Sequence, residues 1–359
     1  MTQSQTAARR ARTLDPENIG PLETWLAREL EAQSVRIVEA VLLSGGAIQE
    51  NWRVVAAVEG GPRNGSNTWV LRTDAVARLS MSLDRAGEFR ALRAAHAAGV
   101  AVAEPILRYA DADLIGAPFL IQSFVSGNAQ ARRIVRDPNL DAFGDALAKR
   151  LGAEMARIHR ISPPNDDLGF LPIPLLSPAR NEVSRLRSAL DEATDPRPAL
   201  EYVLSWLDAH APPADQLSLV HGDFRSGNYL VQDGKLGAIL DWEFAHWGDR
   251  HEDTGWLMAR CWRFGNDAKE VGGIGSRAAF FEGYRSEAAY QVDETVIGYW
   301  EIMAAAKWAT IAVLQGDRYR KGGEDSLELA LTGLMAPEME LDALDAISKL
   351  TASGDVRWQ

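Results

Sequence analysis

Cysteine and long apolar runs are almost absent from this sequence. The one cysteine, Cys261, rules out an intramolecular disulfide and any metal site made of several cysteines, and we expect it to serve in packing. No apolar stretch approaches the roughly 20 residues that span a bilayer. The N-terminal stretch MTQSQTAARR lacks the apolar centre of a signal peptide. We therefore expect a cytoplasmic protein without a membrane partner.

Positive charge is also in short supply. The sequence has 38 Lys and Arg against 50 Asp and Glu, which gives a net charge of -12. A surface that binds the nucleic-acid backbone has to be basic, so we expect no nucleic-acid partner. The acidity does not identify a substrate. Solubility is its ordinary explanation, and a carboxylate-lined pocket for a cationic ligand is the narrower one.

The clearest chemical pattern lies between Leu219 and Trp256. An apolar run ends at Asp223, and Asn228 follows it five residues later. A second apolar run ends at Asp241. The dipeptide DG at 233–234 separates two short apolar segments, which is typical of a β-hairpin. An antiparallel hairpin brings residues that are distant in sequence to one rim, so we expect the three polar side chains to meet.

This order of polar groups suits phosphoryl transfer from a nucleotide. The reaction requires alignment of a hydroxyl with the γ-phosphate and neutralisation of charge by Mg²⁺, with little covalent work by the protein. We assign Asp223 as the carboxylate that accepts the hydroxyl proton. Asn228 and Asp241 supply the oxygen ligands that Mg²⁺ favours. The pattern thus predicts a phosphotransferase that uses ATP and Mg²⁺ as cofactors and a small-molecule hydroxyl as acceptor.

At these residues the chain resembles the aminoglycoside phosphotransferase and choline kinase superfamily (APH family), relatives of the protein kinases. HGDxxxxN at 221–228 is similar to the kinase catalytic loop, with Gly222 in place of Arg, and DWE at 241–243 stands in place of DFG. LSGGA (43–47), VLR (70–72) and GDRHEDTGW (248–256) extend the resemblance over most of the chain. These motifs resemble the bacterial branch that is similar to the kinase-like domain fused to some acyl-CoA dehydrogenases.

The resemblance implies an α+β, bilobal protein-kinase-like fold with a small antiparallel-sheet N-lobe and a larger, mainly helical C-lobe. Residues 1–20 are polar and lack periodicity, so we expect a mobile tail, and we expect Pro21 to begin a helix. We assign residues 21–125 to the N-lobe and 126–359 to the C-lobe. The expected strands cover 35–43, 52–58, 68–73, 102–109 and 118–125, and the expected helices cover 83–98, 140–161, 179–193 and 199–209.

The turn after the first expected strand carries Ser44, Gly45 and Gly46. Glycines allow backbone amides to approach phosphates, although a Gly-Gly pair between strands is by itself more typical of a plain hairpin. The order of this loop ahead of Arg72 and Glu88 favours the phosphate-binding role. The resemblance implies that the loop covers the phosphates of the nucleotide.

The resemblance assigns further N-lobe residues to the nucleotide. Arg72 stands where protein kinases have their ATP-binding lysine, and it would hold phosphate as a bidentate fork. Glu88 stands where the ion-pair partner of that lysine would be. Without the downstream motif, these two residues would be an ordinary surface pair. The backbone of Ser123 and Val125, at the hinge between lobes, would face the adenine edge.

Supporting roles fall to residues around the central motif. His221 is expected to orient the loop and not to transfer a proton. Arg225 is either a contact to phosphate or to the charge of the substrate, or an ordinary surface guanidinium. Glu243 either reaches a second metal through water or braces its loop. By resemblance, Asp253 holds the backbone of the catalytic loop, while Asp249 is expected to cap the helix that follows.

Two other functional classes stay open from the residues alone. A dense set of His and Asp side chains could suit a two-metal hydrolase, but such a site gives no purpose to the Gly-Gly loop, to Arg72 with Glu88, or to Asn228. A non-catalytic nucleotide-binding scaffold is disfavoured because Asp223, Asn228 and Asp241 occur together. The set in question is His221, Asp223, Asp241, His246, Asp249, His251 and Asp253.

The acceptor is the part of the function that the sequence defines least. The helical segments expected near 255–264 and 299–319, with their flanks, carry tryptophans and cations that suit an anionic ligand better than a polycationic aminoglycoside, although packing and solvation explain most of them. The resemblance implies a hydroxylated acyl-CoA as acceptor, by analogy. An aminoglycoside O-phosphotransferase is the alternative. The residues are Trp256, Arg260, Trp262, Arg263, Trp300, Lys307, Trp308, Arg318, Arg320 and Lys321.

Overall fold

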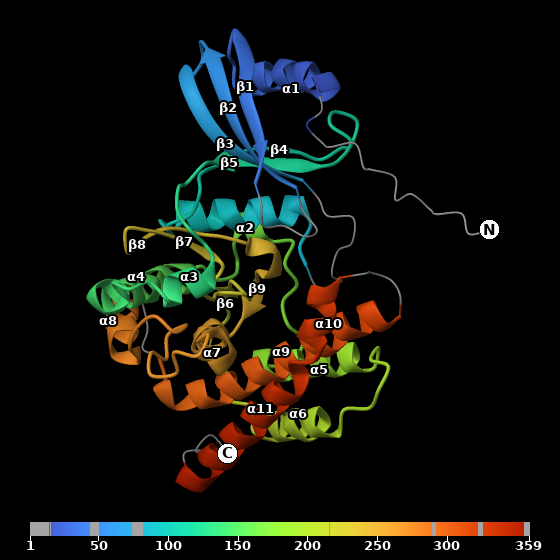
Figure 1. The fold of residues 1–359 in the computed structure, drawn as a ribbon, viewed down its shortest axis with the longest axis vertical. Helices are drawn as coiled ribbons and strands as arrows, with labels where there is room; N and C mark the ends of the chain where they lie inside the picture. Colours follow the sequence, from blue (N-terminus) through green and yellow to red (C-terminus); the bar gives the residue numbers. More distant parts are fainter. Residues whose placement is uncertain are drawn as a thin grey trace, which may run out of the picture. The chain divides into compact units, whose positions relative to one another are not determined.

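The computed structural model describes residues 14, 16–43, 50–73, 82–214, 216–288, 292–321 and 326–354. They fall into two compact units, which we call unit 1 (Met1–His96 with Ala103–Val125) and unit 2 (Ala97–Val102 with Ser126–Gln359). Unit 1 is built on strands, whereas unit 2 is mainly helical (Figure 1). The expected phosphate loop at Ser44, Gly45 and Gly46 lies outside the described residues.

Unit 1 contains a five-stranded sheet with the order β1-β2-β3-β5-β4, and every neighbouring pair is antiparallel. Side chains alternate between buried and half-buried positions along the second strand, so one face of the sheet builds the core. All five expected strands are confirmed, and the last two are shorter than expected. The strands are β1 (Ser34–Leu42), β2 (Asn51–Glu59), β3 (Gly65–Thr73), β4 (Pro105–Tyr109) and β5 (Phe119–Ser123).

Helix α1 (Pro16–Glu29) packs on this sheet through apolar side chains at helical spacing. The expectation that Pro21 begins the helix is wrong. Pro16 occupies the first turn, where a missing N–H has no helical partner to lose, and Pro21 lies inside the helix. The side chain of Glu23 also reaches β1, where its Oε1 accepts a hydrogen bond from the Ile37 N–H at 2.6 Å. This N–H lies beside an irregularity in the β1–β2 pairing.

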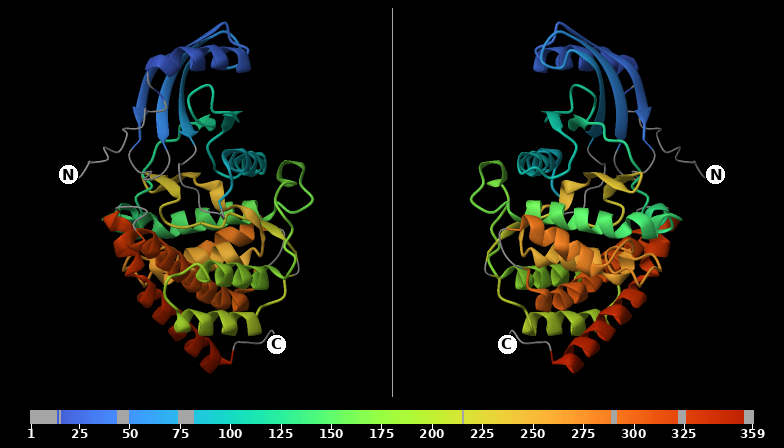
Figure 2. Two further views of the ribbon diagram at one scale, coloured as in Figure 1. Left: turned by 90° about the vertical axis from the view of Figure 1, so that its right-hand side faces the viewer. Right: turned by 90° about the vertical axis from the view of Figure 1, so that its left-hand side faces the viewer.

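Unit 2 is organised around α9 (Ile297–Arg320), whose neighbours share a core of apolar side chains. Figure 2 shows α11 running along this unit beside α6. The helices expected over 140–161, 179–193 and 199–209 are confirmed. The helices of unit 2 besides α9 are α3 (Ala131–Val135), α4 (Leu140–His159), α5 (Pro178–Leu190), α6 (Pro198–Ala209), α7 (His251–Met258), α8 (Arg277–Glu287), α10 (Leu327–Gly333) and α11 (Ala336–Ser353).

Helices α4 and α8 approach each other so closely that the contact requires glycine. A Cβ atom on Gly152 would lie 2.0 Å from the carbonyl oxygen of Phe280, and one on Gly283 would lie 1.8 Å from that of Lys149. Both distances are far inside van der Waals contact, so any side chain there would separate the helices. The packing of α4 matters for the site because this helix ends at His159.

Two small antiparallel sheets carry the central motif. β6 (Ser218–Val220) pairs with β9 (His246–Gly248), and β7 (Tyr229–Gln232) pairs with β8 (Lys235–Ile239). The turn between β7 and β8 consists of Asp233 and Gly234, both with positive φ, as a two-residue hairpin requires. The hairpin expected from the sequence is therefore confirmed. Within the described ranges, no helix has both the length and the apolar character needed to cross a membrane.

Candidate active site

Asp223 lies in the loop between β6 and β7, where three side chains donate hydrogen bonds to its carboxylate. Its Oδ1 accepts from Arg225 Nε at 2.8 Å and from Trp256 Nε1 at 2.8 Å. Its Oδ2 accepts from Asn228 Nδ2 at 2.6 Å. The side chain of Asp223 remains 13% exposed. The donors thus fix the orientation of the carboxylate, and part of it stays accessible to a reactant.

The backbone before Asp223 is held by α7. The buried carboxylate of Asp253 accepts hydrogen bonds from the N–H of His221 at 2.7 Å and from the N–H of Gly222 at 2.9 Å. Gly222 has a φ of 79°, and a Cβ there would lie 2.4 Å from the carbonyl oxygen of Phe244. Only glycine fits this combination of left-handed backbone and close approach.

The ring of His221 braces the same loop. Its Nε2 lies 2.9 Å from the carbonyl oxygen of Leu240, and its Nδ1 lies 3.3 Å from the backbone nitrogen of Asp223. A carbonyl can only accept, so Nε2 donates and Nδ1 accepts from the N–H of Asp223. Both ring nitrogens are therefore occupied, which suits a positioning role.

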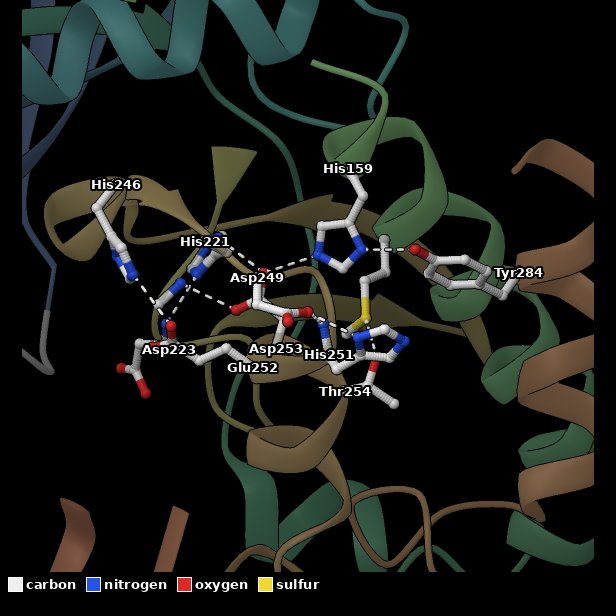
Figure 3. A network of polar contacts seen from close by, with 12 residues as sticks. His159, His221, Asp223, His246, Asp249, His251, Glu252, Asp253, Thr254 and Tyr284 are labelled. Atoms are coloured by element: carbon white, nitrogen blue, oxygen red, sulfur yellow. Dashed lines mark hydrogen bonds and ion pairs between the residues drawn. The ribbon is translucent and has the colours of Figure 1, made fainter. Parts of the chain in front are cut away.

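His159, which sequence reasoning missed, stands on the far side of Asp253. Its Nε2 donates to Asp253 Oδ2 at 3.2 Å, and the hydroxyl of Tyr284 donates to its Nδ1 at 2.7 Å (Figure 3). Burial lowers the pKa of His159 more than Asp253 raises it, so the ring is neutral. Burial would raise the pKa of Asp253, but the hydrogen bonds that it accepts from the His159 ring and from the backbone N–H of His221 outweigh burial and lower that pKa.

Asn228 and Asp241 lie at the same end of the β7–β8 hairpin. Tyr229 pairs with Ile239, and the N–H of Leu240 donates to the Asn228 carbonyl at 2.8 Å. Since Nδ2 of Asn228 is bound to Asp223, its Oδ1 is the atom that a cation would take. An amide oxygen beside a carboxylate forms a hard donor set that fits Mg²⁺, which draws its other ligands from phosphates and water.

The backbone of Asp241 is left-handed, with φ 66° and ψ 67°. Aspartate adopts this region more readily than most residues. The conformation turns the chain from β8 into the 3₁₀ turn Trp242–Phe244. Glu243 lies within that turn and is half-buried.

The His/Asp set that could have suited a two-metal hydrolase is used in pairwise contacts. His251 Nδ1 donates to Asp249 Oδ1 at 2.6 Å, and His246 Nε2 donates to Glu252 Oε2 at 3.1 Å (Figure 3). Asp253 is committed to the loop backbone. In the described part of the chain, no group of three or more His, Cys, Asp or Glu could hold a metal. These pairings disfavour the hydrolase.

Asp249 was expected to cap the following helix, but the N-cap residue of α7 is Arg250, and Asp249 lies one residue before it. Its Oδ1 accepts a hydrogen bond from the N–H of His251, the first residue of α7, at 2.8 Å. The helix is shorter than expected, because it ends at Met258 and a separate 3₁₀ turn covers Arg260–Trp262.

In unit 1, Arg72 and Glu88 form a buried ion pair between β3 and helix α2 (Arg85–Ala97). Arg72 Nη1 lies 2.7 Å from Glu88 Oε1, with the two side chains 10% and 2% exposed. Arg72 Nε also donates to Asn51 Oδ1 at 3.1 Å. A second guanidinium, that of Arg85, pairs with the other oxygen of Glu88. Its position one helical turn before Glu88 was the available signal for this contact.

The two hinge residues lie at the end of unit 1. The N–H of Ser123 donates to the carbonyl of Glu104 at 2.9 Å, so this donor is used inside the sheet and cannot also serve an adenine edge. The Ser123 hydroxyl accepts from the N–H of Glu104 at 2.9 Å. Val125 is the last residue of unit 1.

The candidate acceptor residues are mostly engaged elsewhere. Arg260 pairs with acidic side chains, Arg263 donates to the Met258 carbonyl, and Trp300 lies in the core. Arg225, in contrast, is no ordinary surface side chain. It contacts Asp223, and its guanidinium carbon lies 4.4 Å from the ring centroid of Trp262.

Comparison with known proteins identifies relatives of the motif-bearing region. The model of a family described as the phosphotransferase enzyme family, APH, matches residues 39–290. Acyl-CoA dehydrogenase family member 10 of Mus musculus is 29% identical over 176 residues, which cover 46% of this chain and 16% of the relative. For member 11 of Gallus gallus the identity is 31% over 172 residues, 45% of this chain and 21% of the relative. The match thus spans only a small part of these longer proteins.

Solved structures share the fold over nearly the whole chain. A Ralstonia eutropha protein assigned as an aminoglycoside phosphotransferase has a TM-score of 0.72 at 22% identity, covering 92% of this chain and 98% of its own. A choline/ethanolamine kinase family protein of Mesorhizobium loti has a TM-score of 0.55 at 15% identity, with 89% and 93% covered. These likenesses show the α+β, kinase-like fold. Because the family match extends from β1 into the helices that follow the central motif, the chain belongs to the APH phosphotransferase enzyme family.

Proposed function

We propose that this protein transfers the γ-phosphoryl group of Mg-ATP to a hydroxyl of a small molecule. The observation that carries the proposal is the carboxylate of Asp223, held by three donors beside a hairpin end that presents Asn228 and Asp241. Family membership supports a phosphotransferase reaction. Solved relatives with this fold were determined with ADP and spectinomycin and with GDP and kanamycin. Use of ATP also goes with the expected cytoplasmic location.

In this proposal Asp223 orients the acceptor hydroxyl and takes its proton. The acceptor oxygen forms a bond to the γ-phosphorus as the bond from that phosphorus to the ADP oxygen breaks, and ADP leaves. Asn228 Oδ1 and the Asp241 carboxylate would hold Mg²⁺, which neutralises phosphate charge when bound. His221 and Asp253 keep the backbone of Asp223 in place, and Glu243 lies in the turn after Asp241, where it would either brace this turn or reach a second metal through water.

Unit 1 would supply the contacts to the nucleotide. Arg72 would hold phosphate oxygens, since its ion pair with Glu88 fixes the plane of its guanidinium. The loop at 44–46 would cover the phosphates, and the backbone near Ser123 and Val125 would face the base. Because the Ser123 N–H is bonded within the sheet, its carbonyl would have to carry that contact.

The acceptor that we propose is a hydroxylated acyl-CoA. The curated relatives are acyl-CoA dehydrogenase family members, and Arg225 and Trp262 place a cation and an indole beside the proposed base. Both groups suit an anionic acceptor. Aminoglycosides are the second candidate, because solved proteins with this fold bind kanamycin and hygromycin B.

A panel assay tests both levels of the proposal. The protein is incubated with Mg-ATP and, separately, with hydroxyacyl-CoAs, choline and kanamycin, and ADP release and phosphorylated product are measured. We expect product with a hydroxyacyl-CoA, and a loss of about 100- to 10,000-fold in turnover for Asp223→Asn. Phosphorylation of the amines alone would refute the acyl-CoA assignment. Full activity of Asp223→Asn would refute the assigned base.

A further inference from the structure

Lys307 is a buried cation that contacts the catalytic loop. It lies on α9, is 6% exposed, and is flanked along the helix by buried alanines. Its Nζ donates to the carbonyl oxygen of Gly222 at 3.0 Å and to Glu252 Oε1 at 3.1 Å. An ammonium group taken out of water costs several kcal/mol unless it is paired, so a lysine at this depth needs a reason.

The surrounding carboxylates are not a sufficient reason, because each has a second partner. Glu252 pairs with His246, and Glu182 pairs with Arg185. Lys307 lies 3.9 Å from Glu182, at the limit of an ion pair. An apolar side chain at position 307 would therefore leave each carboxylate with one partner, His246 for Glu252 and Arg185 for Glu182.

Two contacts of Lys307 lead to Asp223. The Gly222 carbonyl belongs to the peptide bond that ends at Asp223, and the N–H of Gly222 is held by Asp253. Both the backbone carbonyl and the backbone N–H of Gly222 are thus hydrogen-bonded. The ammonium also lies 4.9 Å from the ring centroid of Trp256, whose Nε1 donates to Asp223 Oδ1. A cation over an indole face is attracted to it and fixes the ring in place.

We propose that Lys307 is a positioning residue, which holds the Gly222 carbonyl and the Trp256 indole so that the carboxylate of Asp223 keeps one orientation. Its effect on turnover rests on the proposed function, whereas its effect on the loop does not. A misplacement of about 1 Å at a reacting group lowers rates by about 100-fold. The same contact makes α9, a helix with no catalytic motif, part of the catalytic architecture.

The primary test uses Lys307→Met, which keeps the length of the side chain and removes its charge. Hydrogen exchange of the backbone amides in residues 219–228 should become about tenfold faster, and turnover of ATP, with water or the acceptor found in the panel, should fall about 10- to 100-fold. The KM for Mg-ATP should stay unchanged. Lys149→Met removes an exposed lysine that pairs with Glu282 and serves as the matched control.

The double variant Lys307→Met/Glu252→Gln separates positioning from charge balance. It removes a cation and its carboxylate together, so global stability should recover relative to Lys307→Met, while loop exchange stays fast and turnover stays low. Normal loop exchange in the double variant would overturn the proposal, because the effect would then come from an unbalanced Glu252. Unchanged exchange in Lys307→Met would overturn it as well. Fast exchange in a protein that transfers no phosphoryl group would uphold the positioning role and refute the proposed function instead.

Discussion

The amide of Asn228 contacts Asp223 twice, with its Nδ2 2.6 Å from the carboxylate Oδ2 and 2.9 Å from the main-chain carbonyl of the same residue. Asn228 therefore ties the side chain of the proposed base to its own backbone. The amide oxygen is directed elsewhere, so one residue serves both the base and the proposed metal.

Asn228→Asp should abolish turnover although it changes only one group of atoms. The new carboxylate would replace a donor with an acceptor at hydrogen-bond distance from Asp223, and two carboxylates so close cannot both stay ionised at neutral pH. We expect at least a 100-fold loss in steady-state phosphoryl transfer. Asn139→Asp, at an exposed site before α4, should leave the rate unchanged. Comparable rates for Asn228→Asp and the wild type would exclude the role we give to this amide.

Substitutions of Asp241 should separate backbone conformation from metal binding. Asn and Gly tolerate its left-handed conformation, so the free energy of unfolding of both variants should lie within about 1 kcal/mol of the wild-type value. The Ala variant should lose about 1 kcal/mol or more. All three should fail to transfer phosphate because the carboxylate is gone. Urea denaturation measures the first effect, and Mg²⁺-dependent nucleotide binding measures the second. Retained Mg²⁺ dependence in Asp241→Asn would contradict its assignment as a ligand.

His246→Gln should remove part of the loss in the free energy of unfolding that the wild type shows as the pH rises. Burial alone would lower the pKa of His246, but the Glu252 carboxylate outweighs burial and raises it. Both ring nitrogens face acceptors, Glu252 Oε2 and the Phe244 carbonyl, as a charged ring requires. The stability from this charge is complete below the unfolded pKa of about 6.5 and is lost as the pH rises through the raised folded pKa. The wild type should therefore exceed the variant most in mildly acidic buffer.

His159→Gln should show the opposite pH dependence. Burial lowers the pKa of His159 in the folded protein. As the pH drops below about 6.5, the histidine therefore takes up a proton in the unfolded chain before it does so in the folded protein, and the free energy of unfolding falls. The variant has no such titration, and its Nε2 can still donate to Asp253. The difference in the free energy of unfolding between the wild type and this variant should therefore become smaller as the pH is lowered. Urea denaturation from about pH 5 to 9 tests the predictions for both His246→Gln and His159→Gln. Plots of the free energy of unfolding against pH that run parallel for wild type and variant would contradict them.

Arg72→Met and Arg85→Met should differ in nucleotide binding. Each removes one of the two guanidiniums that pair with the buried Glu88 and leaves the other in place, so the two variants should lose similar amounts of stability. Only Arg72 is proposed to contact phosphate, so only its variant should lose affinity for Mg-ATP, by about tenfold or more. Calorimetric titration at a temperature where both variants are folded gives the comparison. Equal affinities would remove Arg72 from the nucleotide site.

The sequence predicted the placement of those candidate residues that a hairpin and its flanking loop encode locally. Asp223, Asn228 and Asp241 could be predicted because a short loop and a two-residue turn set their spacing. Lys307 could not be assigned to the loop, since it lies 85 residues from Gly222 and meets it only through helix packing. From the sequence, Lys307 counts among the cations that suit an anionic ligand or that solvation explains, whereas the structure buries it against Gly222.

Helix α11 shows the same limit in the fold. Helical spacing alone would place Leu341 on the buried face with Leu344 and Ile347, yet Leu341 is 58% exposed. Glu340 and Asp342 turn toward Arg197 and Arg260, while Met339 and other small or apolar side chains form the buried face. Arg197 precedes α6 and Arg260 lies in the 3₁₀ turn Arg260–Trp262, so both partners are distant in sequence and periodicity alone could not reveal them.

The close approach of Gly222 to Phe244 has a consequence for regulation. Protein kinases carry arginine at this position of the motif, and some kinases order their activation loops by pairing arginine with a phosphorylated side chain. Here a side chain would collide with the Phe244 carbonyl before it could reach any such group. The loop that precedes Asp223 is therefore built in a form that offers no guanidinium at that position to a phosphorylated segment.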